Sequence, residues 1–107
     1  MPPYLAQDIH QNARAAADLL RVLGNEHRLQ VLCALREGEM SVGDLAERLG
    51  LSQSALSQHL ARLRGDRLVA TRRQGQTIFY RVSDVAVLAI LEALAGAIQK
   101  RRERGLT

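Results

Sequence analysis

Four hydrogen-bonding side chains lie close together near the middle of the chain: Gln53, Ser54, Ser57 and Gln58. A glutamine amide can pair with two atoms of an adenine edge, and a serine hydroxyl can bond to either donors or acceptors of a base. No acidic residue stands among the four, so no charge there would repel phosphate. This group therefore suits contact with nucleic-acid base edges. The alternative is an ordinary solvated helix face.

A second group combines positive charge with amides some fifteen residues downstream. Arg72 and Arg73 precede a short turn, and Gln74, Gln76 and Thr77 surround it. Arginines of this kind bind phosphates, which supply most of the salt-dependent affinity for DNA. Arg62 adds charge beside the first group. His59 could contact phosphate or brace its own helix, and the residues alone leave both roles open.

The remaining reactive side chains form no recognisable catalytic or metal pattern. His10, His27 and His59 are scattered, and we expect His10 and His27 to be solvated. Cys33 is the only cysteine, which excludes an intrachain disulfide and a Cys-x-x-Cys zinc motif. No nucleophile–base pair, phosphate-binding loop or metal cluster occurs, so we predict that the chain is not an enzyme.

Helices must position the first polar group. Apolar residues at spacings of three and four predict a helix over residues 5–23, and Asn25 can cap a second over 26–36. Ser41 can cap a short third helix, with Asp44 completing a near capping box. A turn at Gly50 and Leu51 leads to Ser52, the expected cap of a helix over 53–65. Its leucines would point inward and its polar residues outward.

The second group falls on a predicted hairpin. Residues 68–73 and 77–82 are expected to be strands, because apolar and polar residues alternate in the second segment and a short turn with Gly75 joins the two. A last helix over 84–104, capped by Ser83 or Asp84, has apolar residues over more than half of its circumference. A helix that packs only on the core of its own subunit needs a narrower apolar stripe. We therefore expect a second subunit to cover the remaining apolar residues of this helix.

Composition agrees with a nucleic-acid partner. The chain has 107 residues, a formal charge of +4 and a pI near 10.2. A single domain over residues 1–107 fits this length. No segment approaches the length of a transmembrane helix, and the first ten residues lack a signal-peptide pattern, so a cytoplasmic location is expected. The basic run at residues 100–104 is expected to be a solvated helix end, or else to add non-specific attraction to DNA.

At this point a family resemblance becomes specific. The run LSQSALSQHLARLR at residues 51–64, with LV at 68–69, TRR at 71–73 and QTIFY at 76–80, resembles the ArsR/SmtB family of small bacterial repressors. The resemblance extends over about residues 17–98 and includes LGNEHRL at 23–29. It is closest to the branch whose members do not sense metals, which includes sulfide-responsive, virulence and nodulation regulators.

The resemblance implies a homodimer through the first and last helices, and repression that a small inducer relieves. Metal-sensing relatives use Cys-x-Cys near residues 39–45, or Asp and His on the last helix; here there is no cysteine at the first place and only Asp84 at the second. We therefore predict no cofactor and no regulatory metal. Redox-sensing relatives pair a cysteine at position 33 with one near 98–99, where this chain has none. Cys33 is either a buried, inert side chain or a one-cysteine redox switch.

We therefore expect an α+β, mostly α, winged helix-turn-helix with five helices and a two-stranded hairpin wing, assembled as a homodimer. Residues 5–23 and 84–104 would dimerise, 41–64 would form the helix-turn-helix and 68–82 the wing. The predicted function is repression at a pseudo-palindromic operator of double-stranded DNA, with no membrane partner. The alternatives are an anti-silencing or architectural DNA-binding regulator without an inducer, and a protein-interaction module that retains the fold.

Overall fold

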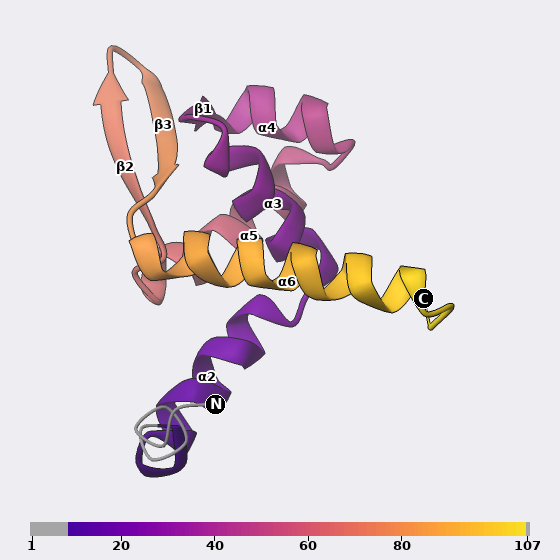
Figure 1. Cartoon of the computed structure of the whole chain (residues 1–107). Coiled ribbons are helices and arrows are strands. Elements are labelled where there is room, and N and C mark those ends of the chain that lie inside the picture. Colours follow the sequence, from indigo (N-terminus) through magenta and orange to yellow (C-terminus); the bar gives the residue numbers. More distant parts are fainter. Residues whose placement is uncertain (1–8, 107) are drawn as a thin grey trace.

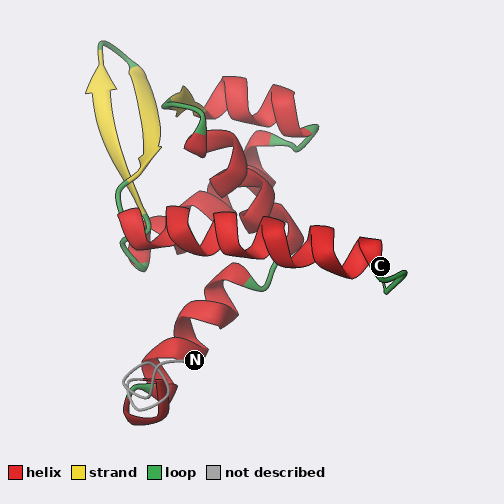
Figure 2. Ribbon diagram, viewed as in Figure 1, coloured by secondary structure: helices red, strands yellow, loops and turns green. Residues whose placement is uncertain are grey.

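The computed structural model describes residues 9–106. Figure 1 shows a helical body with a long hairpin rising from one end, and Figure 2 shows how little of the fold is strand. The elements run in the order α2 (Ala13–Leu23), α3 (Glu26–Arg36), β1 (Met40–Ser41), α4 (Val42–Leu49), α5 (Gln53–Gly65), β2 (Val69–Gln74), β3 (Thr77–Val82) and α6 (Val85–Glu103).

Side-chain caps begin four of these helices where the sequence predicts. The side chain of Asn25 accepts a hydrogen bond from the backbone N–H of the third helical residue of α3, and Ser41 and Ser52 do the same for α4 and α5. Asp84 caps α6 through the backbone N–H of Ala86, at 2.9 Å. Each such bond satisfies a backbone donor that the helix itself leaves free. These caps therefore set the residue at which α3, α4, α5 and α6 each begin.

One apolar core holds the helix pair α4–α5. Leu56, Leu60 and Leu63 of α5 are fully buried, with Leu45 of α4 and Leu32 of α3 beside them in the same cluster. Burying one such side chain stabilises the fold by about 1.5–3 kcal/mol. Because all three buried leucines lie on one stripe of α5, its other faces remain exposed.

The sheet has one strand more than expected. β1 pairs antiparallel with β3, Met40 opposite Tyr80 and Ser41 opposite Phe79, so the order is β1-β3-β2. The predicted two-stranded hairpin is present as β2 and β3, and β1 adds a third strand to its sheet. A strand of two residues is too short to show the alternation of apolar and polar residues that predicts a strand. β1 forms only because the β3 backbone lies beside it. The first wing strand is also displaced by one residue, to Val69–Gln74.

The first and last helices leave apolar side chains uncovered. Asn12 interrupts the helix predicted over 5–23, whose residues 5–8 lie outside the described residues. α2 projects from the body while α6 crosses it (Figure 1). Leu20 is 63% exposed and Val85 is 80% exposed, and only Val87 and Leu91 of α6 are buried. Over residues 9–106, none of the helices is long and apolar enough to span a bilayer.

Candidate nucleic-acid interface

The polar face of α5 is free, as its sequence pattern predicts. Gly50 ends α4 in the left-handed conformation, with φ of 67°, which permits the tight turn into α5. Beyond the turn, the side chains of Gln53, Ser54, Ser57 and Gln58 are exposed while the leucines between them are buried. A short helix pair joined by a glycine turn, with the second helix facing solvent, is the geometry of a helix-turn-helix.

The structure brings part of both polar groups to one groove, which we call the α5–wing groove. Its volume is about 570 Å³ and it is open to solvent. Gln53 and Ser57 line one side, and Gln76 and Thr77 of the hairpin line the other. The start of α4 also lines the groove, and the complete lining is Ser41, Val42, Gly43, Gln53, Ser57, Gln76, Thr77, Ile78 and Tyr80. Hydrogen-bonding groups from α5 and the hairpin thus converge on one space.

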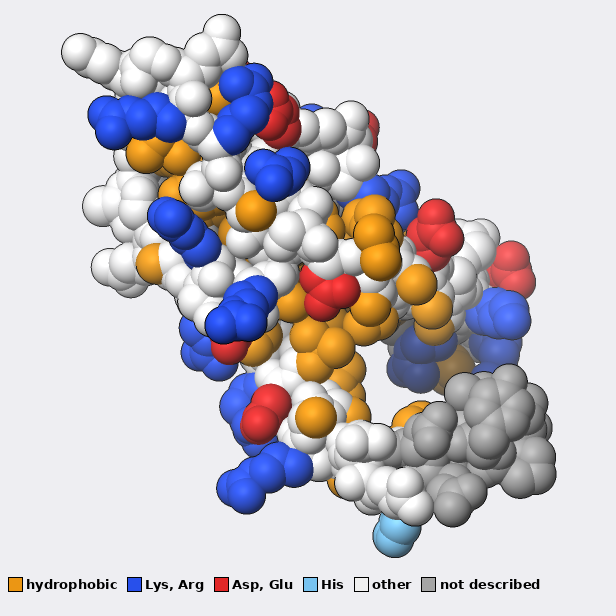
Figure 3. All heavy atoms as spheres, turned by 90° about the vertical axis from the view of Figure 1, so that its left-hand side faces the viewer, with side chains coloured by type: hydrophobic (Ala, Val, Ile, Leu, Met, Phe, Trp, Pro, Cys, Tyr) orange, Lys and Arg blue, Asp and Glu red, His pale blue; other side chains and the backbone are white. Residues whose placement is uncertain are grey.

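The two adjacent arginines of β2, Arg72 and Arg73, occupy different positions. Successive side chains of a strand point to opposite faces, so Arg73, opposite Ile78, shares a face with a groove residue. Arg72 stands opposite Phe79 on the other face and pairs with Glu39. Figure 3 shows basic side chains along the hairpin end of the molecule and apolar ones gathered at mid-height. Arg73, whose Nε–H donates to the carbonyl oxygen of Gly75 at 3.1 Å, is therefore the member of this pair that lies on the groove face.

The carboxylate of Glu39 and the guanidinium of Arg72 shift each other's proton affinity. Hydrogen bonding to Arg72 lowers the pKa of Glu39, and the same bond raises the pKa of Arg72. Both groups are therefore charged at neutral pH. No local sequence pattern points to Glu39, because it lies 33 residues before its partner.

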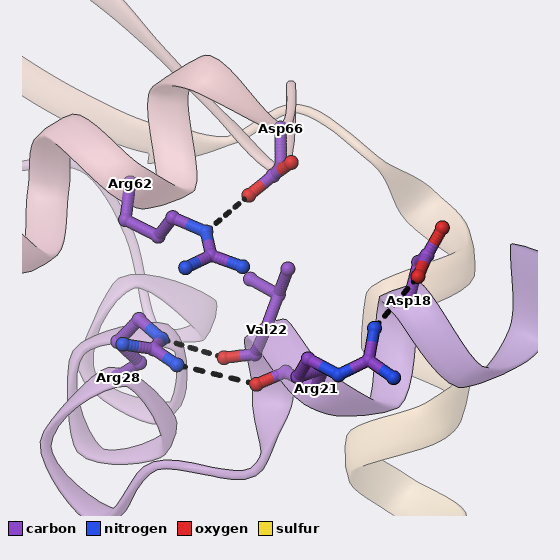
Figure 4. Close-up of polar contacts among 6 residues, drawn as sticks. All are labelled: Asp18, Arg21, Val22, Arg28, Arg62 and Asp66. Atoms are coloured by element: carbon purple, nitrogen blue, oxygen red, sulfur yellow. Dashed lines mark hydrogen bonds and ion pairs between the residues drawn. The ribbon is translucent and has the colours of Figure 1, made fainter.

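His59 and Arg62 have partners within the chain. The rings of His59 and His27 lie 5.4 Å apart, so His27 is half-buried against α5, which corrects the prediction that it is solvated. Burial lowers the pKa of His59, and the charges of His27 and Arg28 lower it further. Arg62 donates to Asp66 at 2.9 Å (Figure 4). The His59–His27 contact joins α5 to α3, whereas the Arg62–Asp66 pair lies within the C-terminal end of α5 itself.

Arg28 is a second polar residue that sequence reasoning missed. Its Nε–H donates to the carbonyl oxygen of Val22 at 2.6 Å, and its Nη2 donates to that of Arg21 at 3.2 Å (Figure 4). A cation satisfies the last carbonyls of α2, where the helix dipole favours positive charge. Arg28 thereby fixes the junction between α2 and α3.

Of the two alternatives left open for Cys33, the buried core thiol does not match the single subunit, in which this residue is exposed. Val31, Leu32, Ala34 and Leu35 take the buried face of α3, and position 33 falls between them toward solvent. Among residues 9–106, His, Cys, Asp and Glu form no group of three or more that could hold a metal ion.

Comparison with known proteins decides the family. The family model described as bacterial regulatory protein, arsR family, matches residues 25–71. The transcriptional activator HlyU of Vibrio cholerae is 52% identical over 92 residues, which are 86% of this chain and 85% of that protein. The chain belongs to the ArsR family of bacterial regulatory proteins.

Other ArsR-family proteins agree in sequence and in fold. The nodulation protein NolR of Rhizobium meliloti is 52% identical, over 85% of this chain and 75% of that protein. The crystal structure of the transcriptional repressor BigR from Xylella fastidiosa superimposes with a TM-score of 0.82 at 38% identity, covering 86% of this chain and 94% of that one. The winged helix-turn-helix fold and the branch expected from the sequence are confirmed.

Membership in the ArsR family settles the broad activity. The chain is a DNA-binding transcription regulator of a family whose members are regulators and not enzymes. The α5–wing groove is consequently the candidate site for DNA.

Proposed function

We propose that two copies of the chain bind a pseudo-palindromic operator, each placing α5 in a major groove. The observation that carries this proposal is the α5–wing groove, where Gln53 and Ser57 face Gln76 and Thr77. In a helix-turn-helix the N-terminal residues of the second helix contact base edges. A two-fold dimer then requires two half-sites about one helical turn apart.

Most of the expected site residues contact DNA in this proposal, either at base edges or at the backbone. Gln53, Ser54, Ser57 and Gln58 contact base edges, because they are the exposed polar residues of the first half of α5. Arg73, with the amides and hydroxyl of the hairpin tip, contacts phosphates or the minor groove beside the half-site. His59, whose ring lies against His27 of α3, supports the position of α5, and Arg62 pairs with Asp66 at the end of its own helix.

Exposed apolar surface supports the dimer. Leu20 of α2 and Val85 and Leu94 of α6 are respectively 63%, 80% and 41% exposed. A small domain gains stability when a partner covers such residues. We infer that α2 and α6 meet their counterparts in a second copy, which would set the distance between the two α5 helices.

Footprinting and affinity measurements test the DNA contacts. On DNA flanking the gene for this protein, we expect a symmetric protected site. Arg73→Ala should weaken binding to all sequences similarly and reduce the slope of log K against log salt by about one. Gln53→Ala should instead reduce discrimination at one base pair of each half-site, by about 1–3 kcal/mol. Arg36→Ala, which removes one exposed charge from the end of α3, outside the expected DNA and dimer contacts, is the matched control and should leave both quantities unchanged.

The regulatory outcome has two candidates. Repression relieved by a small molecule or a redox signal is the first, and the exposed Cys33 thiol supports a redox route. Anti-silencing without an inducer is the second, because HlyU is named an activator whereas BigR is named a repressor. A large ratio of specific to non-specific affinity, lost on treatment with oxidant or sulfide donor in wild type but not in Cys33→Ser, supports the first. A small ratio that no reagent changes supports the second.

A further inference from the structure

We propose that Arg72 is a positioning residue that clamps the wing to the segment before α4, and that it does not contact DNA. This inference rests on the proposed role of the wing in binding DNA. It separates Arg72 from its neighbour Arg73, although the sequence presents the two as one basic pair.

The side chain of Arg72 crosses the whole sheet. Arg72 lies on β2, its guanidinium stands over the Phe79 ring of β3 at 4.6 Å from the centroid, and it ends at Glu39, the residue before β1. Its Nε–H lies 2.7 Å from Oε1 and 2.9 Å from Oε2 of Glu39, and Nη2 also donates to Oε1. Nη1 donates to the amide oxygen of Gln74 at 2.9 Å. The planar guanidinium suits this combination of forked donation and stacking.

The clamp connects the wing to the helix-turn-helix. A two-stranded hairpin is marginally stable alone, and β1 adds only two residue pairs to its edge. Glu39 precedes β1, and Ser41 at the end of β1 caps α4, so a bond from Arg72 to Glu39 ties β2 to the start of α4. Since the start of α4 and the hairpin both line the α5–wing groove, the clamp fixes their relative position there.

Charge and orientation both argue against a phosphate contact by Arg72. It faces away from Ile78 and the groove, whereas Arg73 shares the face of Ile78. Each of its three nitrogens already donates to the carboxylate of Glu39 or to the amide of Gln74. Among the ion pairs within residues 9–106, the Glu39 carboxylate is the least exposed partner, at 30%. A phosphate would have to compete with this carboxylate.

Charge-conserving variants separate a clamp from a phosphate contact. Arg72→Lys keeps the charge but loses the fork, so a clamp predicts operator binding weaker by about threefold to tenfold at an unchanged salt slope. Arg73→Lys, the matched control, should bind nearly as wild type with the same slope. Glu39→Gln should weaken binding relative to Glu47→Gln, which removes the same charge from an exposed site on α4. In the Glu39→Gln background, Arg72→Lys should have no further effect.

The opposite results would overturn the clamp. If Arg72 contacted phosphate, Glu39→Gln would bind more tightly than Glu47→Gln, and Arg72→Ala would reduce the salt slope by about one.

Hydrogen exchange in the free protein tests, without DNA, whether the Arg72–Glu39 contact stabilises the hairpin. The β2–β3 amides should exchange about threefold faster or more in both Arg72→Lys and Glu39→Gln, and unchanged exchange would overturn the inference. If exchange accelerates but wild type and Arg73→Ala bind DNA alike, the clamp stands and the proposed DNA contact of the wing fails.

Discussion

Leu20→Ala should separate dimerisation from folding. Leu20 is 63% exposed on α2, whereas the adjacent Leu19 is half-buried and packs against the core. The two side chains are chemically identical and differ only in what covers them. Truncating Leu20 should therefore remove contacts with a second copy while the fold of each subunit is retained.

The magnitude follows from the exposed fraction. Leu→Ala removes three carbon atoms, each worth about 0.8 kcal/mol when fully buried. With 63% of Leu20 still to be covered, the loss is about 1.5 kcal/mol per subunit by that scale. A symmetric dimer suffers the loss twice, so the dimer Kd should rise about a hundredfold.

Sedimentation equilibrium over a range of protein concentrations measures this Kd. Ile78→Ala, at an exposed apolar side chain on the wing, should leave the Kd unchanged. Leu19→Ala should lower the free energy of unfolding of the subunit more than Leu20→Ala does. If Leu20→Ala dimerises like wild type, or Ile78→Ala dissociates the dimer, the assignment of α2 to the interface is refuted.

Three further substitutions test the fold around α5. Leu60→Ala, at a side chain only 1% exposed, should lower the free energy of unfolding by about 2–5 kcal/mol in urea titration, and a loss below about 1 kcal/mol would contradict its core role. Gly50→Ala forces a side chain into a left-handed turn and should cost about 1–2 kcal/mol by the same assay; an unchanged midpoint would show that the turn can relax. Because burial lowers the pKa of His59, the unfolded chain binds its proton more readily, so stability should fall as pH decreases through about 6.5. His59→Asn should flatten that dependence, and an equally steep pH profile would exclude His59 as its source.

Local signals predicted most of the helical fold. Asn25, Ser41, Ser52 and Asp84 each carry an oxygen that can cap a helix, and each does so. These features depend on residues three or four apart, which a sequence displays directly. The exposed face of α5 follows from the same periodicity.

Contacts between distant segments were beyond such reasoning. β1 depends on Tyr80 and Phe79 being beside it, and the Glu39–Arg72 pair joins residues 33 apart. The apolar neighbours of Cys33 suggested that it could lie on a buried helix face. In the folded subunit the residues on either side of it are buried, and Cys33 itself is exposed. The roles of the α5 and hairpin side chains toward DNA remain predictions, since they depend on a partner.

Directed cleavage of DNA tests most directly whether α5 enters the major groove. An iron chelate that cleaves nearby DNA can be attached at Ser57→Cys in a Cys33→Ser background, so that the new thiol is the only one. Two clusters of operator cleavage about 10 base pairs apart, absent when the chelate is placed at Arg101→Cys, are the predicted result. Cleavage that is uniform along the operator, or as strong from position 101 as from 57, would contradict the account.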